Sequence, residues 1–278
     1  MKTGMNVPIA APPLRPRRWG LLLDATYEIE MDESRIAAGV TFTPYLASPD
    51  TTGIQRLDGE FCDDTPAESD ASGGEHPEFQ AWTLRATESC SALDVDEVWL
   101  DDRISDRWAA FVSAEIAAEL AVGGHTTSDS PTLASSAVQY PYGAADFESV
   151  TSILDYLLAS TLHGAEGMIH TDPSTFNFLV ENAELVDGLW RTPTGHVIVS
   201  DAGYFGMVPE GESFDGRPWI FTSGPVGVKM RKRTRYNETA VEILDRSRNI
   251  VHGRQLADVV FAFDPNTVTA LQLNTIGS

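Results

Sequence analysis

Residues 101–124 read DDRISDRWAAFVSAEIAAELAVGG and carry the clearest helical pattern of the chain. Apolar residues recur there at steps of three and four, as on the buried side of an α-helix. The recurring positions are Ile104, Trp108, Phe111, Val112, Ile116 and Leu120. Two glycines then supply the usual helix stop. We therefore expect a helix over 101–122. Its Trp108, Phe111 and Ile116 should face the core, while Glu115 and Glu119 should form a solvated stripe.

After this helix and a loop rich in Ser, Thr and Gly, short strands alternate with two further helices. Aliphatic residues on one face predict a helix across 147–158. Asp172 followed by Pro173 predicts another, because a carboxylate caps the free amides of a first turn and proline suits its first position. Strands are predicted at 168–170, 196–201, 219–223, 254–263 and 267–273, with turns at Asp187-Gly188, 223–227 and Asp264-Pro265-Asn266.

Upstream of the long helix the chain is more polar and more irregular. Residues 1–20 contain four prolines and four basic residues, which favours an extended arm. Short alternating patterns at 27–45 and 78–84 predict strands. Residues 47–78 are dominated by Asp, Glu, Ser, Gly and Pro, and a loop of that length in a compact domain usually has a function. Between residues 24 and 106 there are 21 acidic residues and four arginines.

The overall charge bounds the classes of partner. The chain of 278 residues carries 19 basic and 41 acidic side chains, for a net charge of −22. Such a surface would repel free nucleic acid and anionic lipid. It fits either subunits kept apart by like charge or adaptation to high salt.

No hydrophobic segment predicts a membrane span or a signal peptide. No apolar run approaches the roughly 20 residues that cross a bilayer, and the run Leu21–Leu23 is too short for a signal peptide. We expect synthesis in the cytoplasm and no membrane partner. Cys62 and Cys90 are expected to be reduced thiols, with a disulfide as the alternative.

No constellation of residues predicts catalysis. The chain has no glycine-flanked nucleophilic serine, no phosphate-binding loop with lysine, no paired-histidine zinc helix and no Cys/His cluster. His170 and Asp172 could suggest a metal site or a proton relay, but the helix cap explains Asp172 without chemistry. We therefore expect no enzymatic activity, no catalytic residue, no cofactor and no metal.

One dense basic segment stands out in this acidic chain. It comprises Lys229, Arg231, Lys232, Arg233 and Arg235, here called the basic strip. In a strand, its alternate members would point to one side. Three interpretations remain open: a solvated face, a contact with acidic residues of a neighbouring subunit, or a contact with packaged nucleic acid.

Five segments occur in an order that resembles a known fold. They are AAELAVGGHTTSDSPTLASSA (117–137), FESVTSILDYLLASTLHGAEGMIHTDPSTFNFLV (147–180), LWRTPTGHVIVSDAG (189–203), WIFTSGPVGVKM (219–230) and NIVHGRQLADVVFAFDPNTVTALQL (249–273). Together they resemble the major capsid proteins of tailed phages, the Hong Kong 97 type, whose fold encapsulin shells share. Arg254 stands where the family typically has a charged residue.

The resemblance implies an α+β fold with three parts. The N-terminal arm would be 1–23 and the extended β-hairpin loop 24–90, including the acidic segment. Residues 91–278 would hold the spine helix (101–122) and the peripheral and axial domains. Some family members crosslink their shells through a lysine in the hairpin loop, but 24–106 contains no lysine, which excludes that chemistry. Any scaffold would be a separate protein.

The resemblance also implies a function. The chain would self-assemble, as pentamers and hexamers, into an icosahedral shell that encloses double-stranded DNA without sequence-specific contact. Its location would be the virion, and scaffold, portal or decoration proteins would be candidate partners. Two alternatives remain: an encapsulin-type nanocompartment around a cargo enzyme, and a minor head or virion component.

Overall fold

The computed structural model describes residues 20–22, 26–31, 33–42, 77–91, 97–124, 130–141, 143–146, 149–232, 242–245 and 250–274. These residues divide into two compact units. The first unit holds the described residues of 85–112 and 232–256, and the second holds those of 18–84, 113–231 and 257–278. The expected arm and the expected acidic loop lie outside the described residues, apart from 20–22, 77 and 78.

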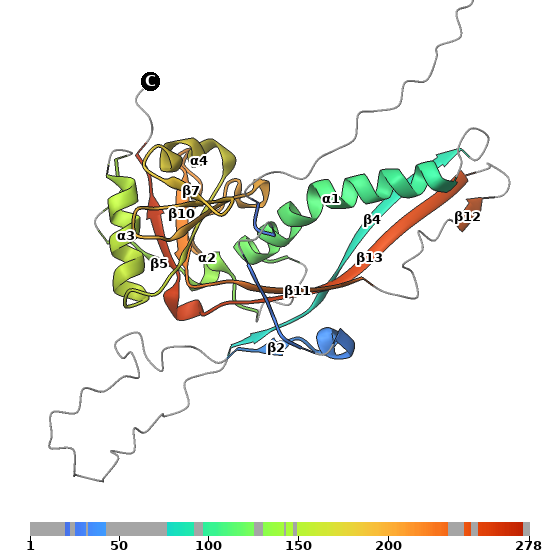
Figure 1. Ribbon diagram of the computed structural model, residues 1–278, viewed down its shortest axis with the longest axis horizontal. Coiled ribbons are helices and arrows are strands. Elements are labelled where there is room, and N and C mark those ends of the chain that lie inside the picture. Colours follow the sequence, from blue (N-terminus) through green and yellow to red (C-terminus); the bar gives the residue numbers. More distant parts are fainter. Residues whose placement is uncertain are drawn as a thin grey trace, which may run out of the picture. The chain divides into compact units, whose positions relative to one another are not determined.

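A seven-stranded sheet organises the second unit (Figure 1). In spatial order its strands are β5 (Val138–Gln139), β14 (Thr269–Gln272), β10 (Trp219–Ser223), β6 (Met168–Thr171), β9 (Val197–Ser200), β8 (Leu189–Arg191) and β7 (Glu184–Val186). β6 runs parallel to β9, and β5 runs parallel to β14, while the other neighbours are antiparallel. The strands predicted at 168–170, 196–201, 219–223 and 267–273 are therefore confirmed.

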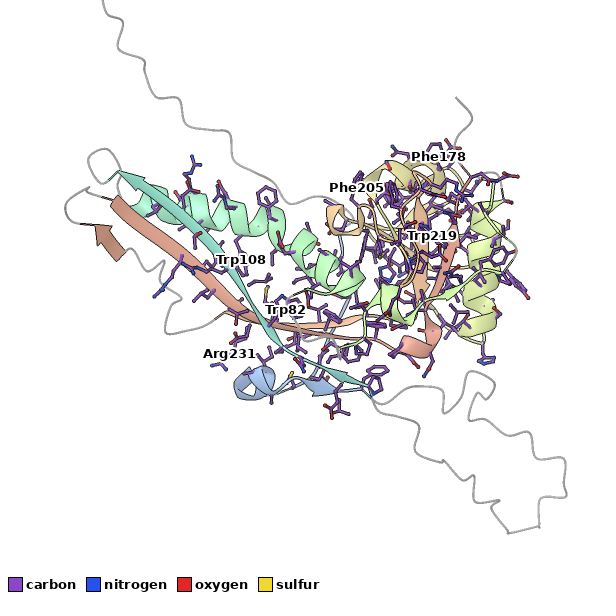
Figure 2. The ribbon with its side chains drawn as sticks, turned by 180° about the vertical axis from the view of Figure 1, so that it is seen from behind. Trp82, Trp108, Phe178, Phe205, Trp219 and Arg231 are labelled. Carbon is purple, nitrogen blue, oxygen red and sulfur yellow. The ribbon has the colours of Figure 1, made fainter. Side chains whose placement is uncertain are left out.

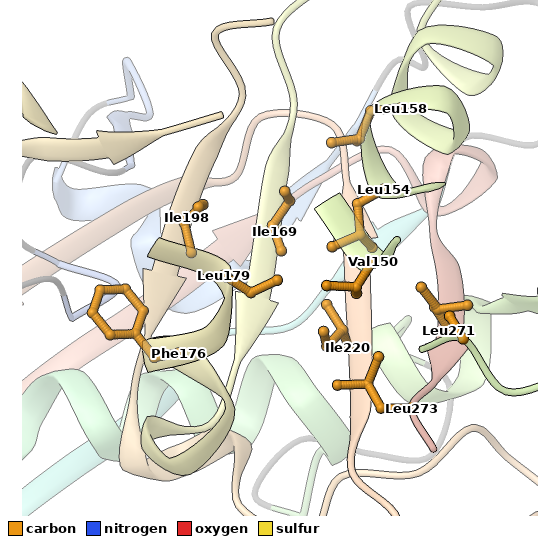
Figure 3. Packing of buried hydrophobic residues seen from close by; sticks show 11 residues of the cluster. Val150, Leu154, Leu158, Ile169, Phe176, Leu179, Ile198, Ile220, Leu271 and Leu273 are labelled. Carbon is orange, nitrogen blue, oxygen red and sulfur yellow. The ribbon is translucent and has the colours of Figure 1, made fainter. Parts of the chain in front are cut away.

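Two helices cover one face of this sheet: α3 (Val150–Thr161) and α4 (Pro173–Val180). The register places Ile169 opposite Ile198, so both side chains point to the same face. Figure 3 shows these strand residues packed against side chains of both helices. The cluster consists of Ala145, Val150, Leu154, Leu158, Ile169, Phe176, Leu179, Ile198, Ile220, Leu271 and Leu273. The apolar face that the sequence indicated for α3 is thus the core of the unit.

Asp172 caps α4, as the sequence predicted. Its Oδ1 atom accepts the backbone N–H groups of Ser174 at 2.7 Å and Thr175 at 3.2 Å, and Pro173 occupies the first helical position. The Thr175 hydroxyl donates to Oδ2 at 2.9 Å. These contacts satisfy amides that have no partner within the helix itself.

Replacing Asp172 with alanine is expected to lower the free energy of unfolding by about 1–2 kcal/mol, because the cap hydrogen bonds are lost. Chemical denaturation of the unassembled subunit measures this. Asp172→Asn keeps an acceptor oxygen at the cap and serves as the control, with a smaller expected loss. Equal losses in the two variants would contradict the capping role.

The hairpin between β7 and β8 also follows its sequence signature. Asp187 and Gly188 have φ angles of 51° and 83°. A two-residue turn with positive φ at both positions matches the right-handed twist of the strands it joins. Asp-Gly suits that turn because both residues tolerate the left-handed region.

The second unit also contains part of another sheet. β1 (Tyr27–Glu28) runs parallel to β11 (Gly227–Lys232), which neighbours β13 (Ile250–Ala262). A separate pair joins β2 (Val40–Thr41) to β3 (Glu78–Phe79) after a 3-10 helix, η1 (Glu33–Ala38). Buried aromatic rings pack here: Phe79, Trp82, Phe261 and Phe263. The short strands predicted in 27–45 are confirmed at 27–28 and 40–41, while 43–45 lie outside the described residues. The strand predicted over 78–84 is present as two strands, with a break at residues 80 and 81.

In the first unit, β13 is flanked by β12 (Glu242–Asp245) and pairs with β4 (Trp82–Ser91). Glu88 on β4 forms a salt bridge with Arg107 at 2.9 Å, and the Arg107 Nη1 atom donates to the Thr87 carbonyl at 2.9 Å. The same carboxylate lies 3.8 Å from Arg103. These contacts attach the part of the long helix that belongs to this unit, up to residue 112, to β4.

That helix, α1 (Glu97–Val122), confirms the main prediction but begins four residues before position 101. Trp108, labelled in Figure 2, is buried at 8% exposure, and Ile116 is fully buried. Phe111 was expected beside them and is 49% exposed, so that expectation is wrong. The buried residues follow one another at intervals of four, so the buried side of the helix rotates by about 40° per step around the axis. At the level of residue 111 it has rotated away from the direction in which Phe111 points.

Glu119 also departs from expectation. It was assigned to a solvated stripe with Glu115 but is only 1% exposed. Near its C-terminus α1 is buried on several sides at once, as the burial of Ala117, Leu120 and Ala121 shows. The expected loop after α1 contains a four-residue helix, α2 (Leu133–Ser136), whose capping box is formed by Thr132 and Ser135.

Candidate subunit-contact strip and buried polar network

The basic strip begins on β11, where the structure describes only part of it. Lys229 and Arg231 are alternate residues of the strand and share a side. Both are partly buried, and Figure 2 labels Arg231. Lys232 ends the strand, with its side chain outside the described part, and Arg233 and Arg235 lie outside the described residues.

Lys229 has an acidic partner in its own chain. Its ammonium group pairs with the carboxylate of Glu28 on β1, the strand beside it. The Lys229 side chain is 13% exposed, whereas that of Glu28 is 76% exposed. The hydrogen bond and positive charge of Lys229 lower the pKa of Glu28. The first residue of the strip therefore helps to attach β1 to β11.

A hydrogen-bonded network lies on the sheet face opposite the helices. It joins Ser223 of β10, His170 of β6 and Tyr204 of a 3-10 helix, η2 (Ala202–Tyr204). His170 Nε2 lies 2.7 Å from the Ser223 hydroxyl, and His170 Nδ1 lies 3.0 Å from the Tyr204 hydroxyl. Ser223 also donates to the carbonyl of Gly224 at 2.7 Å.

The partners determine which groups donate. The single Ser223 proton is used on Gly224, so the serine oxygen accepts from Nε2–H, and Nδ1 accepts from Tyr204. The imidazole is then neutral. Burial lowers the pKa of His170 to about 3. Burial, aided by the charge of Asp201, raises the pKa of Tyr204 well above its ordinary value.

His170 and Ser223 are fully buried, and the serine proton is directed away from the imidazole. The sequence suggested a site formed by Asp172 and His170, but the Asp172 carboxylate instead accepts hydrogen bonds from the first turn of α4. Among the described residues, no group of three or more His, Cys, Asp or Glu side chains could hold a metal ion.

A second buried contact binds the start of the described chain. Asp201 Oδ2 accepts hydrogen bonds from the Ser113 hydroxyl at 2.6 Å and from the backbone N–H of Leu21 at 3.2 Å. The Ser113 oxygen accepts the N–H of Leu22 at 3.2 Å. We call Ser113 and Asp201 the clasp. Sequence reasoning missed it; the only local signal is that Asp201 follows a buried strand.

η2 approaches α1 very closely beside the clasp. A Cβ atom on Gly203 would lie 2.2 Å from the Ala114 carbonyl oxygen, 2.4 Å from the Ala118 nitrogen and 2.8 Å from the Ala117 methyl carbon. Only glycine allows that approach, because real Cβ contacts are never so short. The alanines of α1 and the glycine of η2 together bring Asp201 within reach of Ser113.

Several large apolar side chains of the second unit are exposed. Among the described residues the most exposed of these is Phe205, at 75%, directly after η2 (Figure 2). Others lie at the two edges of the seven-stranded sheet, on β5 and β7. They include Val138, Leu185 and Val186. Apolar side chains at strand edges are typical of surfaces that contact another chain.

Within the described residues, no helix is both long and apolar enough to cross a membrane.

Solved shell structures match the chain over nearly its whole length. The capsid of an empty GTA particle is 14% identical, with a TM-score of 0.53, and the match covers 95% of this chain and 99% of that one. The capsid of the native GTA particle is 15% identical, with a TM-score of 0.52, covering 96% and 100%. The holo-SrpI encapsulin complex from Synechococcus elongatus is 9% identical, with a TM-score of 0.51, covering 99% and 96%.

These matches establish the class of fold. The chain has the α+β fold of the Hong Kong 97-type shell proteins, found in capsids and in encapsulins alike. The fold implied by the five ordered segments is therefore confirmed. No family model and no curated protein matches the sequence.

Proposed function

We propose that this chain is the major subunit of an icosahedral capsid that encloses double-stranded DNA. The observation that carries this proposal is the extent of the fold match. It spans 95% of this chain and 99% of the subunit of the empty GTA capsid. A match over the whole of both chains is expected when the entire fold serves to build a shell.

Assembly of this kind needs complementary surfaces and no catalytic group. Subunits in closed symmetric assemblies join through many repeated contacts, each of modest area. The apolar side chains at the edges of the seven-stranded sheet are suited to such contacts. The arm (1–23) and the hairpin loop (24–90) would extend onto neighbouring copies within pentamers and hexamers.

The charge of the chain is compatible with DNA as the content. A net charge of −22 leaves few phosphate contacts available, so packaged DNA would be enclosed without adhering to the wall. The shell would then be part of a virion, formed in the host cytoplasm. Portal, scaffold and decoration proteins would be further partners.

An encapsulin-type nanocompartment is the second candidate. The fold match to the SrpI encapsulin covers 99% of this chain and 96% of that one, so the fold suits both. The two candidates differ in content: an encapsulin-type shell would hold a cargo protein in place of DNA.

Electron microscopy of the purified protein tests the shell itself. Closed particles of uniform diameter are expected, and a dispersed monomer at all concentrations and salt conditions would overturn the proposal. Particles isolated from the native source then separate the candidates. Nuclease-protected double-stranded DNA identifies a capsid, whereas a stoichiometric second protein without DNA identifies a nanocompartment.

The basic strip gives a prediction about assembly. We expect the triple variant Arg231→Glu, Arg233→Glu and Arg235→Glu to assemble slowly or not at all, because attraction to acidic residues of a neighbour becomes repulsion. Each surface ion pair contributes only about 0–1 kcal/mol, but the contact recurs on every subunit. Light scattering after mixing into assembly buffer measures the rate.

The matched control replaces the same three arginines with lysine, which keeps the charge and should assemble at a nearly normal rate. Circular dichroism of both variants verifies that the subunit is folded. Normal assembly of the folded triple Glu variant would overturn the role of the strip. Salt titration alone would not separate the effects, because salt screens both this attraction and the general repulsion.

A further inference from the structure

Residues 20–22 are held within the second unit by hydrogen bonds to distant parts of the chain. Their partners are distant in sequence: Ser113 lies 91 residues after Leu22, and Asp201 lies 180 residues after Leu21. Both partners accept hydrogen bonds from backbone N–H groups. These contacts therefore fix the position of the backbone and do not depend on a particular side chain. Leu21 itself is fully buried.

The clasp is a connected set of hydrogen bonds. The Ser113 hydroxyl uses its proton on Asp201 and its oxygen on Leu22, so it is satisfied as donor and as acceptor. Asp201 is 2% exposed, and hydrogen bonds that involve a charged group are stronger than neutral ones. A buried carboxylate without these donors would be costly, which favours the bound state of residues 21 and 22.

Gly20 is shaped by the same contact. A Cβ atom there would lie 2.8 Å from the Ser113 hydroxyl oxygen and 2.9 Å from Asp201 Oδ2. A side chain at position 20 would therefore push the backbone off the clasp. Three consecutive residues are thus adapted to Ser113 and Asp201: Gly20 by space, and Leu21 and Leu22 by hydrogen bonds.

The sequence before the clasp differs in charge from the rest of the protein. Residues 1–19 contain four basic residues and no acidic one. Residues 20–278 contain the other 15 basic residues and all 41 acidic residues, a net charge of −26. The excess of acidic residues in any copy of this chain, a second copy included, therefore attracts the arm.

We infer that Ser113 and Asp201 are positioning residues: they fix the point at which the basic N-terminal arm leaves the subunit, so that the arm reaches an acidic surface of a second copy. This inference rests on the proposed shell function. The clasp acts through the arm, and a subunit without an arm has no use for it in assembly.

The first test is hydrogen exchange in the unassembled subunit. Ser113→Ala removes the acceptor for Leu22 and the hydroxyl that donates to Asp201. The amide of Leu22 is expected to exchange about tenfold faster in this variant, because its acceptor is lost and one lost hydrogen bond corresponds to about one factor of ten. The amide of Leu21 should also exchange faster, because its acceptor Asp201 loses the hydrogen bond from Ser113. Amides of β6 and β10 should be unchanged. Ser105→Ala, an exposed position on the same helix, is the matched control and should change none of these rates.

The second test combines the clasp with the arm. Assembly is compared for the wild type, Ser113→Ala, Asp201→Asn, a chain lacking residues 2–18, and the truncated chain with Ser113→Ala. If the clasp acts through the arm, Ser113→Ala should slow assembly of the full chain by about tenfold and have no further effect on the truncated chain. A purely structural effect of Ser113 would slow both chains equally.

The outcomes separate the two proposals. Wild-type chains that form no particles overturn the proposed function. Wild-type particles together with normal assembly of Ser113→Ala overturn the positioning role alone, as does an equal effect with and without the arm. If Asp201→Asn fails to fold, Ser113→Ala still decides, because an alanine fits the space of the serine.

Discussion

Replacing Gly203 with alanine is expected to destabilise the subunit by about 3 kcal/mol or more, which is at or above the upper end for overpacking. The new methyl group would meet the Ala114 carbonyl oxygen at 2.2 Å and the Ala118 nitrogen at 2.4 Å. These are backbone atoms of a helix and cannot rotate away. Either η2 or α1 must move, and both the Tyr204–His170 and the Asp201–Ser113 contacts depend on their present separation.

Gly206→Ala is the matched control for this prediction. Gly206 lies three residues away and has a φ angle of 71°, but a Cβ atom there would meet nothing within 4 Å. Its replacement should cost only about 1 kcal/mol, for the unfavourable backbone conformation. Urea denaturation of the two variants gives the comparison, and equal losses would refute the close-approach argument.

Lowering the pH is expected to destabilise the subunit through His170. The pKa of this buried imidazole is lowered from 6.5 to about 3. The unfolded chain therefore binds a proton below pH 6.5 that the folded chain refuses until about pH 3. The contribution of neutral His170 to the free energy of unfolding is fully present above pH 6.5. Below that pH it falls by about 1.4 kcal/mol per pH unit, which amounts to about 3 kcal/mol near pH 4.5.

Urea denaturation from pH 7 to 4.5 measures this dependence for the wild type and for His170→Gln. The glutamine variant cannot take up this proton. Its free energy of unfolding should therefore fall by about 1.4 kcal/mol less per pH unit than that of the wild type. Other groups, including His196, whose pKa burial also lowers, are present in both proteins and cancel. Tyr204→Phe should retain the wild-type slope, because burial and not the tyrosine hydroxyl causes the shift. Parallel curves for the wild type and His170→Gln would contradict the assignment.

Local signals in the sequence predicted local structure well. Asp172-Pro173 correctly predicted the start of α4, and Asp187-Gly188 correctly predicted the hairpin turn. Both features depend only on residues a few positions apart. The helical periodicity of 101–122 likewise predicted α1. The course of its buried stripe was harder to predict, since Phe111 and Glu119 depend on which elements pack against the helix at each point along it.

Local sequence patterns could not predict contacts between segments that are distant in the sequence. The clasp joins residues 21, 113 and 201, and neither serine nor aspartate at those positions has a distinctive local context. The His170–Ser223 contact depends on β6 lying beside β10, which requires the sheet order. The basic strip was recognisable as a dense charge pattern, but the pairing of Lys229 with Glu28 follows from β1 running beside β11.

The outer strands of the seven-stranded sheet are too short to join many copies of the protein edge to edge. β5 has two residues and β7 has three, and they are the terminal strands of the seven-stranded sheet. Open strand edges at high local concentration invite continuous sheet growth from one molecule to the next, the first step toward fibres. Edges of two and three residues offer too few backbone hydrogen bonds to sustain it. Many copies held side by side would therefore remain discrete molecules.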